Sequence, residues 1–445
     1  MKIATRFSLF LAALSFFVCT TAIRGLAQDN DAITQVNPSS NRATHQQVTP
    51  RGHTNGMSDA RHGITDIDSL VNFNGRFDAQ GFDGNGNPNF KWYINTVGNP
   101  PAMGGTTIIN APIVPVSIDM RNADGSLRYV SIQGGIHTCD DNNLTPDCKR
   151  LFFDVTPFVE PTVESPVFAT TSFSSSPDPT QITDAIQRAE HFNDAKPNWH
   201  TLLNPSVKTT RSMVLKRGTY LFSLNPDGSC CQFVEVAPGA FVNALFPSGV
   251  PPFTPGTPDG NTPVGAAEFA GDITTKDMST FLFPATYLPV GGGFFVIGFH
   301  SYDFEPGDAS NGNRERRYVL NYSSWIKPGF FRSPDFVDVT ATSHEIAEIF
   351  NDPFVASDGI HNIVPWWFSA GNCQNNLEVG DVIEGLPNAT QAITMPNGIT
   401  YHPQNEALLQ WFEFQSPSSA IDGAYSYPNE NTLTALSPPQ TAGCQ

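Results

Sequence analysis

Basic residues are scarce in this chain of 445 residues, which holds 24 Lys and Arg against 42 Asp and Glu and has a formal net charge of −18 at pH 7. A chain this acidic repels nucleic acid and anionic membrane surfaces, because both carry dense negative charge. The composition therefore predicts no nucleic-acid partner. Acidity of this kind is more typical of a soluble protein than of one that has a single specific partner.

Long apolar runs are absent after the N-terminus, so we expect no membrane span. The N-terminus itself has the order of a secretory signal peptide. Two basic residues precede an apolar run over residues 7–18, and small residues precede a cleavage point after Ala27. We therefore expect residues 1–27 to be removed and the mature protein to be secreted.

No internal repeat is visible in the rest of the chain. Residues 28–64 are polar with few large apolar side chains, which predicts a flexible leader. β-Branched, apolar stretches such as 106–120 and 318–325 predict strands, whereas a clear helical period is found over 180–193. The sequence thus predicts a single α+β domain over 65–445, rich in strands and with few helices.

Three local expectations accompany this fold. Pro112 and Pro115 lie within the predicted strand 106–120 and favour an edge strand or a bulge. Residues 266–282 are expected to contain a helix, and residues 408–414 are expected to form a strand. Phe192 is expected on the buried stripe of the helix over 180–193.

The cysteines have no C-x2-C spacing, so a zinc site of four cysteines is the weaker explanation for them. Seven cysteines become six when Cys19 leaves with the signal peptide, and an even number in an exported chain favours disulfides. Cys139 and Cys148 flank a short polar loop, and we expect them to be bonded to each other. The pairing of the others is left open: Cys230, Cys231, Cys373 and Cys444.

Residues 338–353 form the stretch that we expect the fold to hold at its centre. Asp338 suits the N-cap position of a helix, and the proline at 353 ends it. His344 and Glu348 are one turn apart and project from the same face, with Glu345 beside them. The segment has no Lys or Arg, so the three ionisable groups are expected to be buried, where they need partners or a metal.

An imidazole and a carboxylate one turn apart can hold a zinc ion, and an adjacent glutamate can take a proton from water. The common zinc-protease motif has histidine at both ligand positions, whereas this chain has H-E-x-x-E. We expect one zinc ion with His344 and Glu348 as ligands and Glu345 as the general base. The alternative is a helix with an ordinary polar face.

A catalytic zinc site needs a third protein ligand and one open position. Glu378 and Asp381, in a turn-like segment after the helix, are the expected sources of that ligand. His300, His402 and Tyr401 are outside candidates, either as ligands or as groups that stabilise a transition state.

Calcium is the rival ion, because Asp352 and the glutamates all offer oxygen ligands. Asp352 also fits an ordinary helix-ending sequence. The nitrogen of His344 argues against calcium.

Residues 343–353 together with 378–381 resemble secreted bacterial zinc-dependent peptidase-like proteins that have an H-E-x-x-E motif. Segments 373–381, 401–404 and 180–188 are similar to segments of the same group. This resemblance implies a metal-dependent hydrolase in which His344 and Glu348 are ligands and Glu345 is the base.

A looser likeness links the chain to the phosphate-induced (exordium-like) proteins, through residues 105–118, 297–300 and 408–410 together with the helix motif and Tyr401. It implies an extracellular protein without a defined reaction. We therefore expect a secreted zinc-dependent hydrolase, most simply a peptidase that acts on peptide or protein. The alternative is a non-enzymatic extracellular or cell-wall-associated binding protein with at most a structural metal.

Overall fold

The computed structural model describes residues 42–44, 51–52, 67–78, 91–131, 137–140, 143–223, 232–249, 251–331, 333, 335–355, 366–367, 373–374, 377–413 and 415–436. The predicted signal peptide lies outside the described residues, and so do Cys230, Cys231 and Cys444. Cys373 lies in the short strand β21 (Cys373–Gln374), but its side chain is not described.

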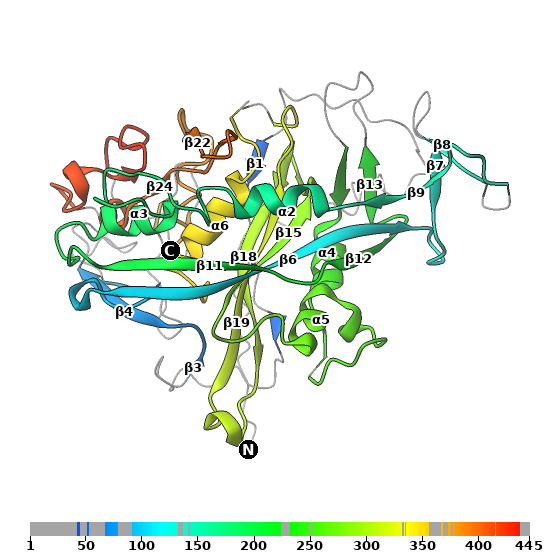
Figure 1. Ribbon diagram of the computed structural model, residues 1–445, viewed down its shortest axis with the longest axis horizontal. Helices are drawn as coiled ribbons and strands as arrows, with labels where there is room; N and C mark the ends of the chain where they lie inside the picture. Colours follow the sequence, from blue (N-terminus) through cyan, green and yellow to red (C-terminus); the bar gives the residue numbers. More distant parts are fainter. Residues whose placement is uncertain are drawn as a thin grey trace, which may run out of the picture.

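A mixed nine-stranded sheet runs through the molecule (Figure 1), with the main path β10–β6–β15–β19–β18–β2. The central strands β6, β15 and β19 are parallel to one another, and β18 is antiparallel to β19. These four strands are β6 (Thr106–Arg121), β15 (Met278–Pro284), β18 (Gly298–Glu305) and β19 (Glu315–Trp325). The remaining strands of this sheet are β2 (Arg51–Gly52), β3 (Ile67–Asp68), β10 (Phe152–Phe153), β11 (His200–Val207) and β12 (Arg211–Lys216). The predicted strand-rich α+β class is confirmed.

The strand predicted over residues 106–120 is β6, but it is not an edge strand as its prolines suggested. Ile113 pairs with β11 on one side and with β15 on the other. The β11 pairing ends at Ile113, and the β12 pairing begins at Val116. Pro115 lies between the two, where the missing N–H interrupts neither ladder.

Side chains of the central strands alternate between two hydrophobic cores, as the twofold period of a strand requires. On β15, Phe281 and Phe283 belong to one core and Leu282 to the other. On β19, Tyr322 belongs to the core of Phe281, and Val319 belongs to the core of Leu282. The sheet is therefore covered on both faces, and both cores can position buried groups.

Six α-helices lie among the described residues: α2 (Thr156–Val163), α3 (Ile182–Glu190), α4 (Pro238–Leu245), α5 (Pro263–Ala270), α6 (Thr340–Asn351) and α7 (Leu409–Phe412). Figure 1 shows α2, α3 and α6 near one another and α4 with α5 in a separate place. The apolar side chains of α4 and α5 join the core of Phe281, and those of α3 join the core of Leu282. Among the residues that the structure describes, no helix has the length and apolarity needed to cross a bilayer.

A second sheet of five strands has the order β1–β17–β16–β14–β13. Its strands are β1 (Arg42–Thr44), β13 (Tyr220–Ser223), β14 (Phe233–Val236), β16 (Thr286–Gly291) and β17 (Phe294–Val296). β1 of this sheet and β2 of the first both fall within the predicted leader, residues 28–64. β1 pairs with β17, and β2 pairs with β18, so two short parts of that segment are strands.

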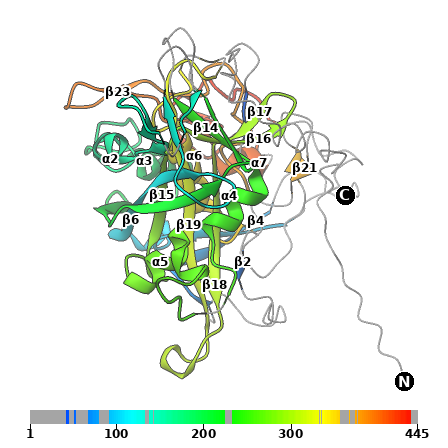
Figure 2. The same ribbon diagram turned by 90° about the vertical axis from the view of Figure 1, so that its right-hand side faces the viewer.

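Four two-stranded sheets lie apart from these: β4 (Asn72–Asp78) with β5 (Lys91–Val97), β20 (Trp366–Trp367) with β21, β22 (Ile393–Thr394) with β23 (Thr400–Tyr401), and β24 (Glu406–Ala407) with β25 (Ser426–Tyr427). β18 and β19 form a long antiparallel hairpin that extends toward one end of the molecule (Figure 2).

Several local predictions were wrong in whole or in part. The helix expected within residues 266–282 is confirmed only for residues 266–270, the end of α5, and strand β15 begins at Met278. Residues 408–414 contain helix α7 instead of the predicted strand. Phe192, expected on a buried stripe, is 49 % exposed just beyond the end of α3. The run 408–414 is short and apolar and fits both the helical and the strand period, so tertiary packing decides between them.

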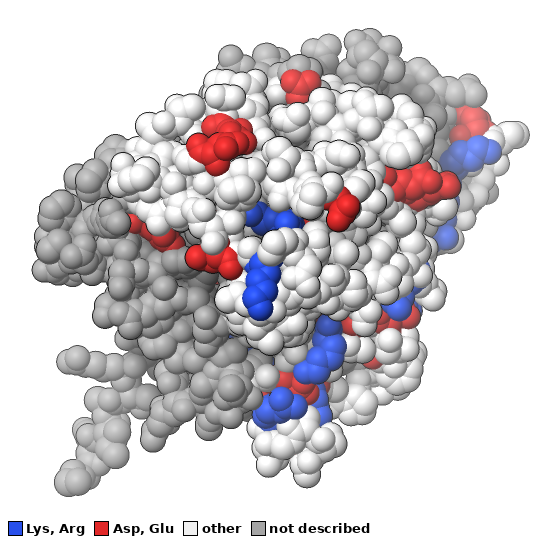
Figure 3. Space-filling model, turned by 60° about the vertical axis from the view of Figure 1, so that its left-hand side comes forward, with Lys and Arg blue, Asp and Glu red and all other residues white. Residues whose placement is uncertain are grey.

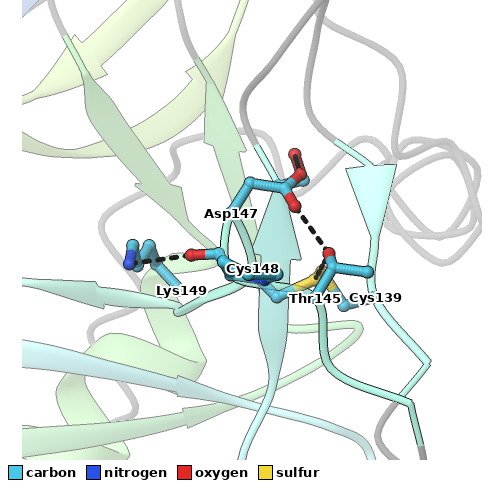
Figure 4. Close-up of a disulfide and its surroundings, with 7 residues drawn as sticks. Cys139, Thr145, Asp147, Cys148 and Lys149 are labelled. Atoms are coloured by element: carbon cyan, nitrogen blue, oxygen red, sulfur yellow. Dashed lines mark hydrogen bonds between the residues drawn. A yellow bond between two sulfur atoms is a disulfide. The ribbon is translucent and has the colours of Figure 1, made fainter.

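The predicted disulfide is confirmed. Cys139 and Cys148 are bonded, with their Cα atoms 6.1 Å apart. They lie at the small sheet of β7 (Tyr129–Ser131), β8 (His137–Thr138) and β9 (Lys149–Arg150). Within the loop, the Thr145 hydroxyl donates to Asp147 (Figure 4).

Candidate metal centre

Helix α6 carries the H-E-x-x-E motif into the interior. All twelve of its residues are buried, and His344, Glu345 and Glu348 are 0 %, 0 % and 1 % exposed. One face of α6 packs on the core of β15 and β19 through Ile346 and Ile349. The other side is covered by a third cluster, in which Ala347 meets apolar residues from the segment after the helix: Leu377, Val379, Val382 and Leu409. The predicted burial of the motif is confirmed.

The helix begins one residue later than its sequence suggests. Its N-cap is Val339, not Asp338, which has a φ of 46° and lies outside the helix. The Asp338 carboxylate accepts from the Val339 N–H at 2.6 Å and from the backbone N–H of His402 at 2.9 Å. Asp338 therefore ties the start of α6 to a distant segment instead of capping the first turn.

The first group of potential ligands is formed by His344, Glu348 and Asp381. The Nε2 atom of His344 lies 3.0 Å from Glu348 Oε1 and 3.7 Å from Asp381 Oδ1. One ligand atom from each residue lies within 4.8 Å of the others, and all three are buried. This group could hold a metal ion, and it contains three of the residues that the sequence predicted as ligands.

The segment that carries Asp381 is fixed over α6 by its backbone. The N–H of Gly380 donates to Glu348 Oε1 at 3.1 Å, and the N–H of Leu377 donates to Asp352 Oδ2 at 3.1 Å. The Gln404 side chain donates to the Gly380 carbonyl at 2.7 Å. Asp352 therefore holds the loop in place and is not one of the three potential ligands.

Gly380 is required here for space. A Cβ atom at this position would lie 2.5 Å from the Nδ1 and Cε1 atoms of His344, closer than real Cβ contacts come. The loop therefore reaches the imidazole only because this residue has no side chain. This explains the glycine directly before Asp381.

A second group is formed by His300, Glu345 and Glu348. His300 is in β18, and its Nδ1 lies 3.3 Å from Glu348 Oε2 and 3.5 Å from Glu345 Oε2. Ligand atoms of these three buried residues also lie within 4.8 Å of one another. Glu378 Oε2 is 3.8 Å from the same nitrogen, so Glu378 borders this group, and its carboxylate also interacts with Glu348 and Asp381. His300, an outside candidate from the sequence, therefore belongs to a possible ligand group.

Burial and neighbouring like charges shift the pKa values of the residues at this site. Burial lowers the pKa of His344 to about 4, which keeps its imidazole neutral. Burial raises the pKa of Glu348 to about 8, against hydrogen bonds that favour its charged form. The pKa values of Glu345 and Glu378 are raised well above their usual range by burial and by the neighbouring carboxylates. Perturbed groups gathered in this way are typical of functional sites.

Glu406 is a further buried carboxylate at this site, and the sequence analysis did not predict it. It is 0 % exposed in β24, and burial raises its pKa, with further contributions from the charges of Glu348 and Asp381. Among the described residues, neither of its carboxylate oxygens has a hydrogen-bond partner. The backbone N–H of Ala407 donates to the Val379 carbonyl at 3.0 Å, and this contact brings Glu406 to the loop.

Two outside candidates have other partners. The Nδ1 atom of His402 lies 2.8 Å from Asp338 Oδ2, and the Tyr401 hydroxyl accepts from the Asn397 amide at 3.0 Å. Neither residue belongs to the two ligand groups. On the face shown in Figure 3, charged side chains are scattered among uncharged ones, so the surface there carries no dense acidic patch. The acidic cluster is an interior feature.

No protein-family model matches the chain, and no curated protein or solved structure matches it either. The two family resemblances therefore stay predictions.

Proposed function

We propose that the protein is a secreted zinc-dependent hydrolase that acts on peptide or protein substrates. The observation that carries this proposal is the convergence of His344, Glu348 and Asp381 inside the fold, with Glu345 next to them. Zinc accepts both imidazole nitrogen and carboxylate oxygen, and a catalytic zinc site has three protein ligands. The arrangement leaves a fourth position for water or substrate.

The donor distances suit zinc. Zinc–ligand bonds of about 2.0–2.2 Å in a tetrahedral site place neighbouring ligand atoms about 3.3–3.5 Å apart. The distances from His344 Nε2 to Glu348 and Asp381, 3.0 Å and 3.7 Å, lie on either side of that spacing. Calcium prefers six to eight oxygen ligands, so the imidazole in the group favours zinc.

Glu345 suits the role of general base. It is fully buried on the same helix, and its charge interacts with those of Glu348 and Asp381. Its Oε2 atom lies 3.5 Å from His300 Nδ1, so the carboxylate faces the interior site where an attacking water would be held. A bound zinc ion would supply a Lewis acid and would make the attacking water more acidic.

Secretion and the substrate class rest on other features. The Cys139–Cys148 disulfide is the type of bond that persists in an oxidising compartment, which agrees with the signal-like N-terminus. The peptide substrate comes from the resemblance to H-E-x-x-E peptidase-like proteins. The rival is a non-enzymatic extracellular protein with a structural ion.

The test is metal analysis of the purified mature protein combined with casein digestion, with and without a chelator. Zinc in the protein and chelator-sensitive cleavage are expected. Absence of both would favour the binding-protein alternative. Cleavage that persists after complete removal of metal would contradict the proposed chemistry.

Two variants separate binding from chemistry. Glu345→Gln should keep the ion at His344 but should lower hydrolysis by about 10²–10⁴-fold, the usual contribution of a positioned base. Glu348→Gln should lose the metal and the activity, because an amide is a poor zinc ligand. Glu235→Gln is the control, since Glu235 is a half-buried glutamate in β14, outside both ligand groups. If Glu345→Gln loses the metal at His344 and Glu348→Gln keeps it, the two roles are reversed.

A further inference from the structure

Glu348 faces two different imidazoles with its two oxygens. Oε1 lies 3.0 Å from His344 Nε2, and Oε2 lies 3.3 Å from His300 Nδ1. A carboxylate has two oxygens and about four lone-pair directions, so it can bind two cations at once. An imidazole at the same helical position could bind only one ion through its ring nitrogen facing the site.

We propose that the site holds two divalent zinc ions bridged by Glu348. The first is bound by His344, Glu348 and Asp381, and the second by His300, Glu345 and Glu348. This inference rests on the first ion of the proposed function and adds a second ion with its own ligands. Paired ions of this type lie about 3.5–4 Å apart in two-metal hydrolases.

The geometry of the second group supports this inference directly. The distances from His300 Nδ1 to Glu348 and Glu345, 3.3 Å and 3.5 Å, match the spacing of about 3.3–3.5 Å between ligands of tetrahedral zinc. Glu378 Oε2, 3.8 Å from the same nitrogen, is placed to add a further oxygen. His300 comes from a strand and Glu345 from a helix, so both are held by regular structure.

The backbone also makes room for the second group. A Cβ atom at Gly298 would lie 2.5 Å from Glu345 Oε1, so this glycine lets β18 approach the helix closely. Gly380 does the same for the first group, beside His344. Each half of the cluster therefore has its own glycine at the point of closest approach.

The number of carboxylates supports a second cation. Five of them gather in the interior and are at most 5 % exposed: Glu345, Glu348, Glu378, Asp381 and Glu406. One divalent ion offsets two of these charges, and a second offsets two more. Buried carboxylates are stable only where their charge is compensated, and Glu406 has no hydrogen bond within the described part of the chain.

Glu345 can act as base and as ligand in the same site. Its Oε2 faces His300, and a monodentate carboxylate keeps a second oxygen for a proton. The second ion therefore does not remove the general base from the proposed hydrolase. It adds a cation next to the position where negative charge develops.

The stoichiometry of zinc in the full mature chain tests this inference. After loading with zinc and dialysis, elemental analysis should give two zinc ions per parent chain and one per His300→Gln chain. His137→Gln, which changes an exposed histidine on β8, should keep two. Anomalous scattering from crystals should show two zinc peaks about 3.5–4 Å apart in the parent.

The outcomes separate this inference from the proposed function. One zinc ion in the parent, unchanged in His300→Gln, would overturn the second site and leave the hydrolase proposal intact. No zinc in the parent would overturn both. If His300→Gln does not fold, as judged by circular dichroism, the parent stoichiometry and the anomalous peaks still decide.

Discussion

Replacing Gly380 with alanine tests the geometry of the first ligand group with one methyl group. Gly380 is not in the left-handed backbone region, so alanine meets no backbone strain there. The cost is steric, because the new Cβ would lie 2.5 Å from two ring atoms of His344. His344 is 0 % exposed on a helix packed on both sides, so its ring has little freedom to move.

The loop must therefore move by about 0.9 Å to restore an ordinary contact distance near 3.4 Å. That shift should lengthen the hydrogen bonds of Gly380 with Glu348 and with Gln404, which are 3.1 Å and 2.7 Å long in the parent protein. Overpacking of this kind costs about 1–3 kcal/mol, and we expect a loss of stability of that size. Displacement of Asp381 from His344 should lower zinc affinity by about 10–100-fold, as other changes around metal ligands do.

Two assays measure these effects. Urea unfolding in the presence of a chelator gives the stability of the metal-free chain, and competition with a chromophoric chelator gives zinc affinity. Gly239→Ala in α4 is the control, because a Cβ there meets nothing within 4 Å. If Gly380→Ala unfolds at the parental urea concentration and binds zinc with parental affinity, the loop does not lie against His344 as described.

The other predictions concern pH. The hydrogen bond from His402 to Asp338 raises the pKa of His402 above 6.5, so its stabilisation should be complete below pH 6.5 and should be lost as the pH rises through the higher value in the folded protein. Unfolding measured between pH 5 and 9 should show this dependence in the parent and lack it in His402→Ala; equal profiles would contradict the pairing. Burial raises the pKa of Glu190 from 4.5 to about 8, so stability should fall as the pH rises from 4.5 to 8, and Glu190→Gln should remove that part of the fall. A steeper fall in Glu190→Gln would refute the assignment.

Sequence patterns predicted the helix of the site because its signals are local. The apolar period of residues 338–353 and the closing proline place a helix there, and α6 runs from Thr340 to Asn351. Asp381 was predicted as a possible ligand because it follows that helix in a turn-like segment. The structure brings it to 3.7 Å from His344. Glu378, the other candidate, lies beside His300 instead.

The rest of the cluster depends on contacts that local patterns do not encode. His300 reaches the site because β18 pairs with β19 in a register that sets His300 opposite Asn321 and because α6 packs on both strands. Glu406 reaches it through a backbone bond between Ala407 and Val379. Neither residue has a neighbour in sequence that marks it as a ligand, so only the tertiary fold brings them to the site.

The arrangement gives a reason for glutamate, instead of histidine, at the second ligand position of the motif. Compared with H-E-x-x-H, an H-E-x-x-E helix offers zinc a carboxylate in place of an imidazole. Here, however, the two oxygens of Glu348 point to histidines from two different elements, α6 and β18. Histidine at position 348 could present a single nitrogen to one of those sites, and the group around His300 would lose its link to the group around His344. A glutamate is therefore the residue type that lets one helix position serve both groups, and Glu348→His should leave room for one ion at most.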